Sequence, residues 1–347
     1  MSNPTIYDIA KKAGVSAATV SKVLNGRSDV GRKTIEKVKR ITEELGYQPN
    51  SIARGLATKR SKTVGVFFED HLNSGFRHPF LQDILASFKD VIGAKGYDLI
   101  FFANNHPDTQ LESFEARAYN RNVDGLVLLG VPRSHPNLTS LAQSEIPCMS
   151  IDLDLQGPRA SYLSSDNIGG AIKGVDFLVE MGHKDIAFIY DVFGTKPGYD
   201  RLVGFKKAME SHGLAIRQEW LVNGDFSEPG GYKATKGLLA SNPVPTAIFC
   251  ASDMMAIGAM KAIKEQGLQV GVDVSVIGFD DIKLLQYITP GLTTVRQNTE
   301  EMGKHAALEL LKLMDNASSV PNVLTIDTEL VIRESVAKRT SESLPTN

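Results

Sequence analysis

The stretch TIYDIAKKAGVSAATVSKVLNG, residues 5–26, contains two short apolar-periodic segments on either side of one glycine. At 3.6 residues per turn, one face of a first helix carries Ile6, Ile9, Ala10 and Ala13. We expect Gly14 to end that helix and Ser16 to cap a second one, whose apolar face carries Val20, Val23 and Leu24. Two helices joined by a short turn with glycine predict a helix-turn-helix, whose second helix enters the major groove of DNA.

Local signals also mark the start of the first helix and the position of a third. Thr5 is a candidate N-cap, with Asp8 at the third helical position. A third helix is expected over residues 32–44, because apolar residues recur there at helical spacing: Ile35, Val38, Ile41 and Leu45. The start of the chain therefore predicts a small all-α domain with its own core.

Charge is distributed unevenly along the chain. Residues 1–62 hold 13 Lys or Arg against 5 Asp or Glu, whereas the remaining residues hold 25 against 35. A basic segment of this kind indicates a polyanionic partner, because each phosphate that Lys or Arg neutralises releases condensed counterions. The alternative, a solvated basic tail, does not explain the helical spacing of the apolar residues.

Beyond residue 62, short apolar runs alternate with amphipathic stretches such as residues 80–95 and 167–181. Strands are expected at 63–68, 98–103, 125–130, 148–152, 185–191, 246–252 and 274–280, and two more at 293–297 and 323–334. Near-continuous apolar strands joined by crossover helices are typical of parallel sheets that are covered on both faces. This number of strands predicts two doubly wound α/β subdomains rather than one.

The composition limits the class of protein. Net charge is −2 and hydrophobic residues make up 42% of the chain, as in ordinary globular proteins. No apolar run is long enough to cross a membrane, and charged residues interrupt the N-terminal apolar stretches, so no signal peptide is expected and the chain is placed in the cytoplasm. Cys148 and Cys250 each lie at the end of an apolar run and are expected to be buried free thiols.

Catalytic patterns are missing from the sequence. Neither the glycine pattern of dinucleotide-binding folds nor the P-loop pattern G-x-x-x-x-G-K-[ST] occurs, and no nucleophile elbow is present. The seven histidines are scattered, and we expect them at the surface or in loops. The sequence therefore predicts a binding protein rather than an enzyme, with no metal site and no cofactor.

Residues 5–26, followed by VKRITEELGYQPNSIARGLATKRSKTVGV at residues 38–66, resemble the N-terminus of the lactose/galactose repressor family. The resemblance implies a sequence-specific DNA-binding transcriptional regulator, with base edges faced by Ala17, Ala18 and Lys22. It also implies phosphate contacts from Tyr7, Ser16, Thr19, Ser21, Asn25 and Tyr47. Lys22 can donate to guanine O6 or N7, although it lacks the rigid fork of arginine, and the alanines offer only apolar contact or close approach.

NSIARGLATKR at residues 50–60 matches the hinge helix of that family, in which a leucine wedges into the minor groove; Leu56 is that residue here. Eleven residues that include Gly55 are too few for a stable isolated helix, so we expect the hinge to order only when paired on DNA. A plain flexible linker is the alternative. Because one reading head contacts only a half-site, we expect a homodimer on pseudo-palindromic double-stranded operator DNA. The C-terminal tail lacks the leucine heptads of a tetramer.

The resemblance also implies a division of the chain into domains. The helix-turn-helix domain covers 1–49, the hinge and linker 50–62, and a disordered tail 341–347. A first core subdomain combines 63–164 with 296–326, and a second combines 165–295 with 327–340. Together they resemble periplasmic sugar-binding proteins, with three crossings between the lobes.

Polar residues follow several of the expected strands, where ligands of open α/β sheets bind. These residues are Glu69 and Asp70, Asn104 and Asn105, Asp152, Asp191, Ser252 and Asp253, and Asp280 and Asp281. Carboxylates and amides at one rim suit hydrogen bonds to vicinal hydroxyl groups. Alternative roles remain open: Asp166 as an N-cap, and Asp253 and Asp281 as caps of helices that begin at residues 254 and 282.

The resemblance assigns effector contacts to several of these positions and to others: Asp70, Asp152, Arg201, Phe226, Ser252, Asp280 and Gln297. Phe226 matches an aromatic residue that stacks on the ligand, but it could equally belong to the core. The chain departs from the family pattern in the loop at residues 69–79, which is longer than usual and in which Glu69 replaces a proline.

We expect a repressor whose operator affinity is controlled by a sugar or sugar derivative bound between the two subdomains. A purine- or nucleoside-responsive regulator, or one that depends on a partner protein, is the alternative with the same fold. Two further alternatives are a carbohydrate-active enzyme with a DNA-binding head and an architectural DNA-binding protein without a ligand. The sequence does not decide whether the effector lowers or raises the affinity of the protein for its operator.

Overall fold

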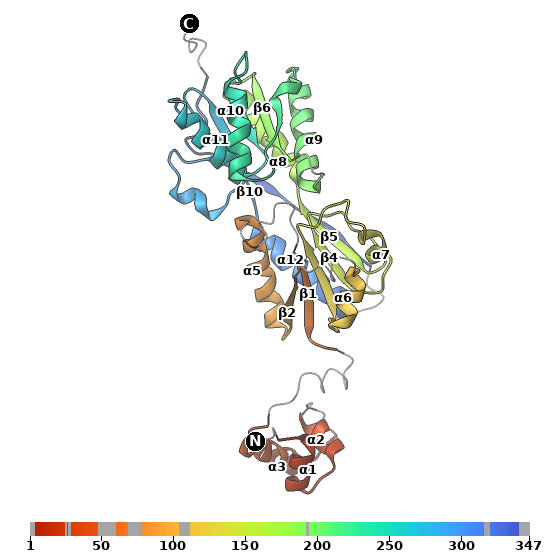
Figure 1. The fold of residues 1–347 in the computed structure, drawn as a ribbon. Helices are drawn as coiled ribbons and strands as arrows, with labels where there is room; N and C mark the ends of the chain where they lie inside the picture. The colour runs from red at the N-terminus through yellow and green to blue at the C-terminus, as the bar shows by residue number, and fades with distance from the viewer. Residues whose placement is uncertain are drawn as a thin grey trace. The chain divides into compact units, whose positions relative to one another are not determined.

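The structure is a computed structural model that describes residues 4–24, 26, 29–47, 60–68, 76, 78–103, 112–191, 194–315 and 320–339. The chain divides into two compact units, a head of residues 1–62 and a body of residues 63–347 (Figure 1). The hinge residues 50–59, including Leu56, and the tail 341–347 lie outside the described residues.

The described residues of the head form three helices: α1 (Ile6–Ala13), α2 (Ala17–Leu24) and α3 (Arg32–Glu44). Both sequence-predicted caps are present, because Thr5 and Asp8 form a capping box and Ser16 Oγ accepts a hydrogen bond from the backbone of Thr19 at 3.1 Å. Gly14 ends α1 in the left-handed conformation. The buried core has the expected apolar residues: Ile9, Ala10, Ala13, Val20, Val23, Val38 and Ile41.

The described residues of the body form two six-stranded sheets. The first is entirely parallel and has the order β11-β5-β4-β3-β1-β2. Its strands are β1 (Thr63–Phe68), β2 (Asp98–Phe102), β3 (Gly125–Leu129), β4 (Cys148–Ile151), β5 (Ala160–Ser165) and β11 (Val323–Ile326). Helices α12 (Thr299–Asp315) and α5 (Pro79–Ala94) pack together on one face. The short helices of this lobe are α6 (Phe114–Asn120) and α7 (Leu138–Ala142).

The second sheet has the order β12-β10-β9-β8-β6-β7, and it is parallel except for β12, which runs antiparallel to β10. Its strands are β6 (Ile186–Tyr190), β7 (Leu221–Asn223), β8 (Ala247–Cys250), β9 (Ser275–Asp280), β10 (Thr293–Gln297) and β12 (Thr328–Val331). Helices pack in two pairs: α8 (Asn167–Glu180) with α9 (Lys196–Ser211), and α10 (Glu228–Leu239) with α11 (Asp253–Glu265). Two short 3-10 helices are η2 (Gln218–Trp220) and η3 (Lys283–Tyr287).

Strand pairing moves two of the expected boundaries between the lobes. Ser165 pairs with β11 in the first sheet, although we expected it in the second subdomain. Arg296 and Gln297 pair with strands of the second sheet, although we expected them in the first subdomain. The reason is that β5 and β10 each pair with neighbouring strands up to their last residue. The chain crosses to the other lobe only after that residue.

Both cysteines are buried and free, as the sequence predicted. Burial raises the pKa of both thiols, so neither is a reactive thiolate. The expectation for the histidines is wrong at His183, which is buried between the Thr246 hydroxyl and the backbone carbonyl of Ala337. A glycine turn brings this side chain inward, where hydrogen bonds satisfy both ring nitrogens.

Candidate functional site

The face of α2 that the sequence assigns to DNA carries small or half-exposed side chains. Ala18 is exposed, Ala17 packs partly against the head core, and the Ser16 and Thr19 hydroxyls lie 2.9 Å apart. Lys22, in the last turn of α2, places its Nζ 2.6 Å from Asp29 Oδ2. Small side chains at residues 17 and 18 are compatible with the predicted close approach to a groove floor, and the base contact of Lys22 remains a prediction.

The residues assigned to phosphates lie on three different parts of the head. Tyr7 on α1 is 73% exposed, so its hydroxyl is available to a partner. Ser21 is half-buried, and Tyr47 packs its ring partly against the head core. Asn25 lies outside the described residues. These roles remain predictions.

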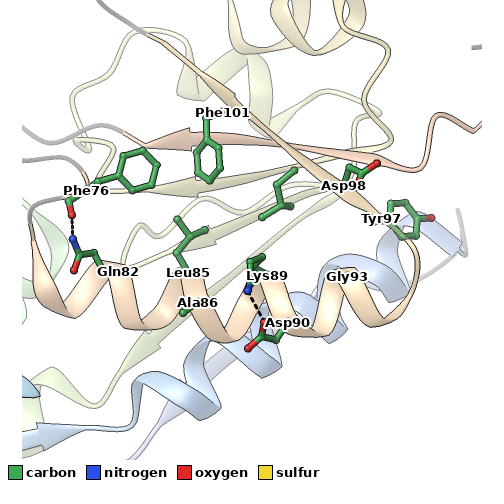
Figure 2. A pocket seen from close by; sticks show the side chains of 11 residues that line it. Phe76, Gln82, Leu85, Ala86, Lys89, Asp90, Gly93, Tyr97, Asp98 and Phe101 are labelled. Carbon is green, nitrogen blue, oxygen red and sulfur yellow. Dashed lines mark hydrogen bonds and ion pairs between the residues drawn. The ribbon is translucent and has the colours of Figure 1, made fainter. Parts of the chain in front are cut away.

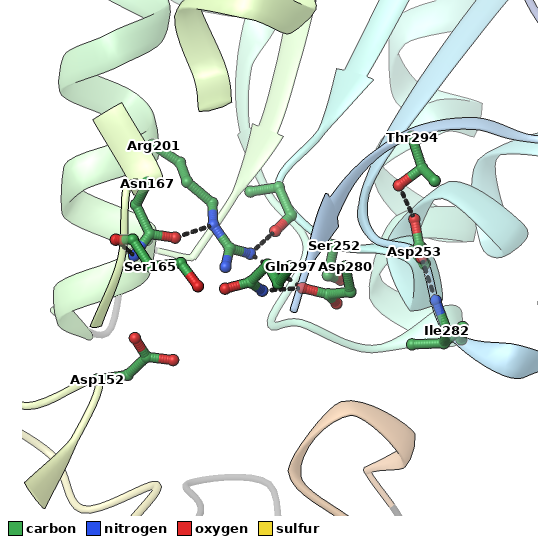
Figure 3. A network of polar contacts seen from close by, with 12 residues as sticks. Asp152, Ser165, Asn167, Arg201, Ser252, Asp253, Asp280, Ile282, Thr294 and Gln297 are labelled. Carbon is green, nitrogen blue, oxygen red and sulfur yellow. Dashed lines mark hydrogen bonds and ion pairs between the residues drawn. The ribbon is translucent and has the colours of Figure 1, made fainter. Parts of the chain in front are cut away.

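Arg201 is the centre of a polar network in the body, shown in Figure 3. It extends from α9 and is only 2% exposed, with its guanidinium 3.7 Å from the centre of the Phe279 ring. Its Nε donates to Asn167 Oδ1 at 2.8 Å, and its Nη1 donates to the carbonyl of Ala251. Three different segments therefore fix its plane before any ligand arrives.

Asp280 and Gln297 complete this network from the ends of adjacent strands. Asp280 Oδ1 lies 3.5 Å from Arg201 Nη1 and accepts a hydrogen bond from Gln297 Nε2 at 2.7 Å. Gln297 Oε1 is buried and has no hydrogen-bond partner within the part of the chain that the structure describes. A buried acceptor without a donor is costly, so this oxygen marks a position that a donor from outside the chain would satisfy.

Three residues next to this network have structural roles that the sequence did not predict. Ser252 is fully buried and caps α11, because its hydroxyl accepts from the Met255 backbone; its contact with an effector stays a prediction. Asp253 does not cap the helix; its carboxylate accepts from Thr294 Oγ1 at 2.6 Å and from the Ile282 backbone at 2.9 Å. The expected cap position was one residue too late.

Asp281 also has a role other than helix capping. Its carboxylate forms ion pairs with Arg296 and Arg333, each at 2.7 Å. Asp280 and Asp281 both have positive φ angles, 125° and 59°, which turn the backbone sharply after β9. This turn sends Asp280 toward Arg201 and sends Asp281 toward the outer cations.

Asp152 approaches the network from the first lobe. It follows β4 with a φ of 56°, and its carboxylate accepts from Ser164 Oγ at 2.8 Å. Figure 3 shows this carboxylate directed toward the side on which Arg201 and Gln297 lie. Residues of both lobes thus contribute to one rim. Glu69, Asp70, Asn104 and Asn105 lie outside the described residues.

Phe226 lies in the turn after β7 with a φ of 50°. Its side chain is half-buried and packs against the body core. A ring in this position contributes to packing and still presents part of its surface. Its stacking on a ligand remains a prediction.

Burial controls the ionisation of the acidic residues at this rim. It raises the pKa of Asp280 to about 7, while the nearby Arg201 guanidinium opposes that shift. Burial also raises the pKa of Asp253, and the charge of Asp280 adds to the effect. The pKa of Asp152 is raised by desolvation and lowered in part by Arg201. These carboxyl groups can therefore act both as acceptors and, when protonated, as donors.

Sequence reasoning missed Asn167, which orients Arg201, and Thr294, which anchors Asp253. Asn167 is the first residue of α8, directly after Asp166, whose carboxylate caps the helix by accepting from the Gly169 backbone at 2.8 Å. The cap signal placed the helix start correctly, but nothing local indicated that the Asn167 amide faces a partner 34 residues away.

Two negative findings apply to the described part of the chain. No cluster of three or more His, Cys, Asp or Glu side chains there is arranged to hold a metal ion. None of its helices is long and apolar enough to cross a membrane.

Known proteins resemble both units of the chain. Residues 5–50 match the family of bacterial regulatory proteins called the lacI family, and residues 175–336 match a periplasmic binding protein-like domain. A curated relative, the HTH-type transcriptional repressor PurR of Erwinia tasmaniensis, is 36% identical over 96% of this chain and 97% of its own length.

Two solved structures are similar over nearly the whole chain. The lac repressor dimer bound to operator and the anti-inducer ONPF has a TM-score of 0.84 at 30% identity, covering 97% of this chain and all of the other. A complex of the transcriptional regulator CelR with cellobiose has a TM-score of 0.73 at 30% identity, covering 96% and 99%. Identity at this level over almost the full length shows that the chain belongs to the lacI family of bacterial regulatory proteins and is a DNA-binding transcriptional regulator.

Proposed function

We propose that this chain is a homodimeric repressor whose grip on a pseudo-palindromic operator is set by a neutral polyhydroxylated molecule, a sugar or sugar derivative, bound at the rim around Arg201. The observation that carries the proposal is the buried Gln297 Oε1, which lacks a donor among the described residues and adjoins Asp280 and Arg201. A hydroxyl group can donate to this oxygen and at the same time accept from a neighbouring N–H.

Charge favours a neutral ligand over an anionic one. The described cations at and next to the rim are Arg201 and Lys196, whereas the carboxyl groups are Asp152, Asp200, Asp253 and Asp280. Lys196 is already paired with Asp200 at 2.5 Å, and Arg201 faces Asp280. Both described cations are thus already paired and are not offered to a phosphate or carboxylate, whereas vicinal hydroxyls can form hydrogen bonds with these carboxyl groups in either protonation state.

The relatives support this ligand class and keep one alternative open. The similar regulator CelR binds cellobiose, which is a neutral sugar, whereas the name of the relative PurR points to purines. A purine would use some of the same donors and acceptors. The proposed effector is bound without chemical conversion, so it should be recovered unchanged after incubation with the protein.

Ligand binding at this rim can affect the head by changing the arrangement of the two lobes. Asp152 belongs to the first lobe and Arg201 to the second, so a ligand that contacts both favours one lobe arrangement over another. The hinge around Leu56 joins the head to the first lobe, and we propose that its pairing on DNA follows that arrangement.

A groove between α5 and the edge strand β2 supports the proposed pairing of two chains (Figure 2). Strand β2 is the last strand of the first sheet, so its outer edge has no neighbouring strand in that sheet. Phe101 is 44% exposed there, and its ring lies 5.0 Å from that of Phe76, while Leu85 lines the floor. An exposed apolar edge of this kind is normally covered, and the lac repressor that this chain resembles is a dimer.

Thermal unfolding across a panel of neutral sugars, uronates, sugar phosphates and purines tests the effector proposal. A ligand present at 100 times its dissociation constant adds roughly 2.7 kcal/mol to the free energy of unfolding. We expect a neutral sugar to give this shift and to change operator binding in a parallel gel-shift titration. If only purines or anionic sugars gave the shift, the proposed ligand class would be wrong.

Two variants near opposite ends of β9 test whether the ligand binds at the rim. Asp280→Asn alters the carboxylate beside Arg201, whereas Asp273→Asn alters an exposed carboxylate just before the other end of that strand. We expect Asp280→Asn to lose most of the ligand-induced shift and Asp273→Asn to keep it. Equal shifts for both variants would place the ligand elsewhere.

A further inference from the structure

Within the described part of the head, an ion pair joins the reading helix to a carboxylate outside it. Lys22 Nζ lies 2.6 Å from Asp29 Oδ2, and the two side chains are 49% and 55% exposed. An exposed pair of this kind contributes only about 0–1 kcal/mol to stability. The fold of the head therefore does not depend on it, and Asp29 is not part of the head core.

A carboxylate beside the reading helix is unfavourable for general DNA binding. Every phosphate that approaches Lys22 also approaches Asp29, so the negative charge reduces the counterion-release contribution of the lysine. Asp8 and Glu44 are acidic residues of the head with structural partners, because Asp8 closes the capping box of α1 and Glu44 pairs with Lys12 at 2.9 Å. Asp29 instead pairs with the residue assigned to base reading.

We propose that Asp29 determines specificity by reading one G·C base pair together with Lys22. The lysine ammonium has three N–H donors, so it can donate to Asp29 and to guanine O6 or N7 at the same time. The carboxylate can accept from the N4 amino group of the paired cytosine. The proposal rests on the assignment of α2 as the reading helix.

The pair also compensates for what lysine lacks. A flexible ammonium has no fixed fork, so alone it discriminates weakly between bases with acceptors in the major groove. Asp29 limits the direction of the ammonium, and it penalises a base pair that turns an acceptor toward the carboxylate. Repulsion of the wrong base pair raises specificity even where total affinity falls.

Selection from random duplexes, carried out with the full chain, gives the preferred half-site and tests the proposal. Its preferred sequence is then titrated in duplexes with each base pair replaced in turn, using wild type, Asp29→Asn and Asp29→Ala. We expect one G·C position per half-site at which wild type discriminates roughly tenfold or more and both variants lose that discrimination. Both variants should also bind random duplex more tightly than wild type.

Glu44→Gln is the matched control. It removes one acidic charge from an ion pair of the same head with similar exposure, since Lys12 and Glu44 are 49% and 46% exposed, but not from the reading helix. We expect this variant to keep the wild-type preference at every position. The thermal midpoints of all variants should stay within a few degrees of wild type, because both pairs are exposed.

Two results would overturn the inference in distinguishable ways. If Asp29→Asn and Glu44→Gln raised affinity for all duplexes alike and left every base preference intact, Asp29 would act only as a negative charge. If wild type itself showed no preferred sequence, the assignment of the reading helix would fail and the inference with it.

Discussion

Two ion pairs, one in the head and one in the body, differ in how far solvent reaches them. Lys22 and Asp29 of the head are about half exposed, whereas Arg201 and Asp280 of the body are 2% and 3% exposed. Exposed charges remain hydrated, so their pairing contributes little and they stay available to a polyanion. A buried guanidinium has lost its water and depends on each protein partner. The head is thus suited to exchange partners, and the body to fix one geometry.

Removing one partner of the buried pair, and one partner of an exposed pair in the head, tests this contrast and should give the largest effect. Arg201→Met leaves Asp280 in the interior without its cation, which costs about 3–5 kcal/mol of unfolding free energy. Lys12→Met removes an exposed pair and should cost about 0–1 kcal/mol. Urea denaturation of both variants measures the two values, and similar losses would contradict the comparison.

Truncation of the hinge leucine should give the next largest effect, on binding rather than folding. Leu56→Ala removes the proposed minor-groove wedge, and truncation of a buried leucine costs about 2 kcal/mol or more. Operator affinity should therefore fall by more than about tenfold while effector binding by the body is unchanged. An unchanged operator affinity would refute the wedge assignment.

The two units should also respond to pH in opposite directions. The pKa of Asp280 is raised to about 7 from 3.8, so the folded body holds a proton that the unfolded chain loses, and its contribution to stability declines as pH rises across that interval. Hydrogen bonds from Thr5 lower the pKa of Asp8, so its contribution to the head is lost as pH falls below the ordinary carboxyl range.

Thermal midpoints of wild type, Asp280→Asn and Asp8→Asn between pH 3 and pH 8 check these directions. The thermal midpoint of wild type should fall relative to that of Asp280→Asn as pH rises from about 4 to 7. The thermal midpoint of wild type should rise relative to that of Asp8→Asn as pH rises from acidic values. The same direction for both differences would contradict the assignment.

The smallest expected effect concerns an exposed ion pair between the two lobes. Lys283 Nζ on η3 lies 2.7 Å from Asp83 Oδ1 on α5, and the lysine is 80% exposed. Asp83→Asn should weaken effector binding by up to about fivefold and reduce its salt dependence, because a surface pair contributes about 0–1 kcal/mol. Isothermal titration at low and high salt measures both quantities. Tighter binding by the variant would show that the pair favours the other lobe arrangement.

The head could be predicted almost completely from the sequence because its determinants are local. Thr5, Asp8, Gly14 and Ser16 act on backbone groups within a few residues, and the apolar period fixes the buried faces. In the body, the apolar strands were predicted, but β5 was missed because serines interrupt its apolar pattern, and β7 because it has only three residues. The antiparallel direction of β12 was not predicted either.

The sequence by itself determined the helix-turn-helix, the alternation of strands and helices, and the position of Asp280 at the end of a strand, whereas Arg201 was assigned from the resemblance to the family. Only the tertiary structure decided that Asp253 is held by Thr294 and that Gln297 retains an acceptor without a donor among the described residues. Asp253 and Thr294 are 41 residues apart, and Gln297 and Asp280 are 17 residues apart. Hydrogen bonds over such separations depend on strand order and on the turn after each strand, which local sequence periodicity does not encode.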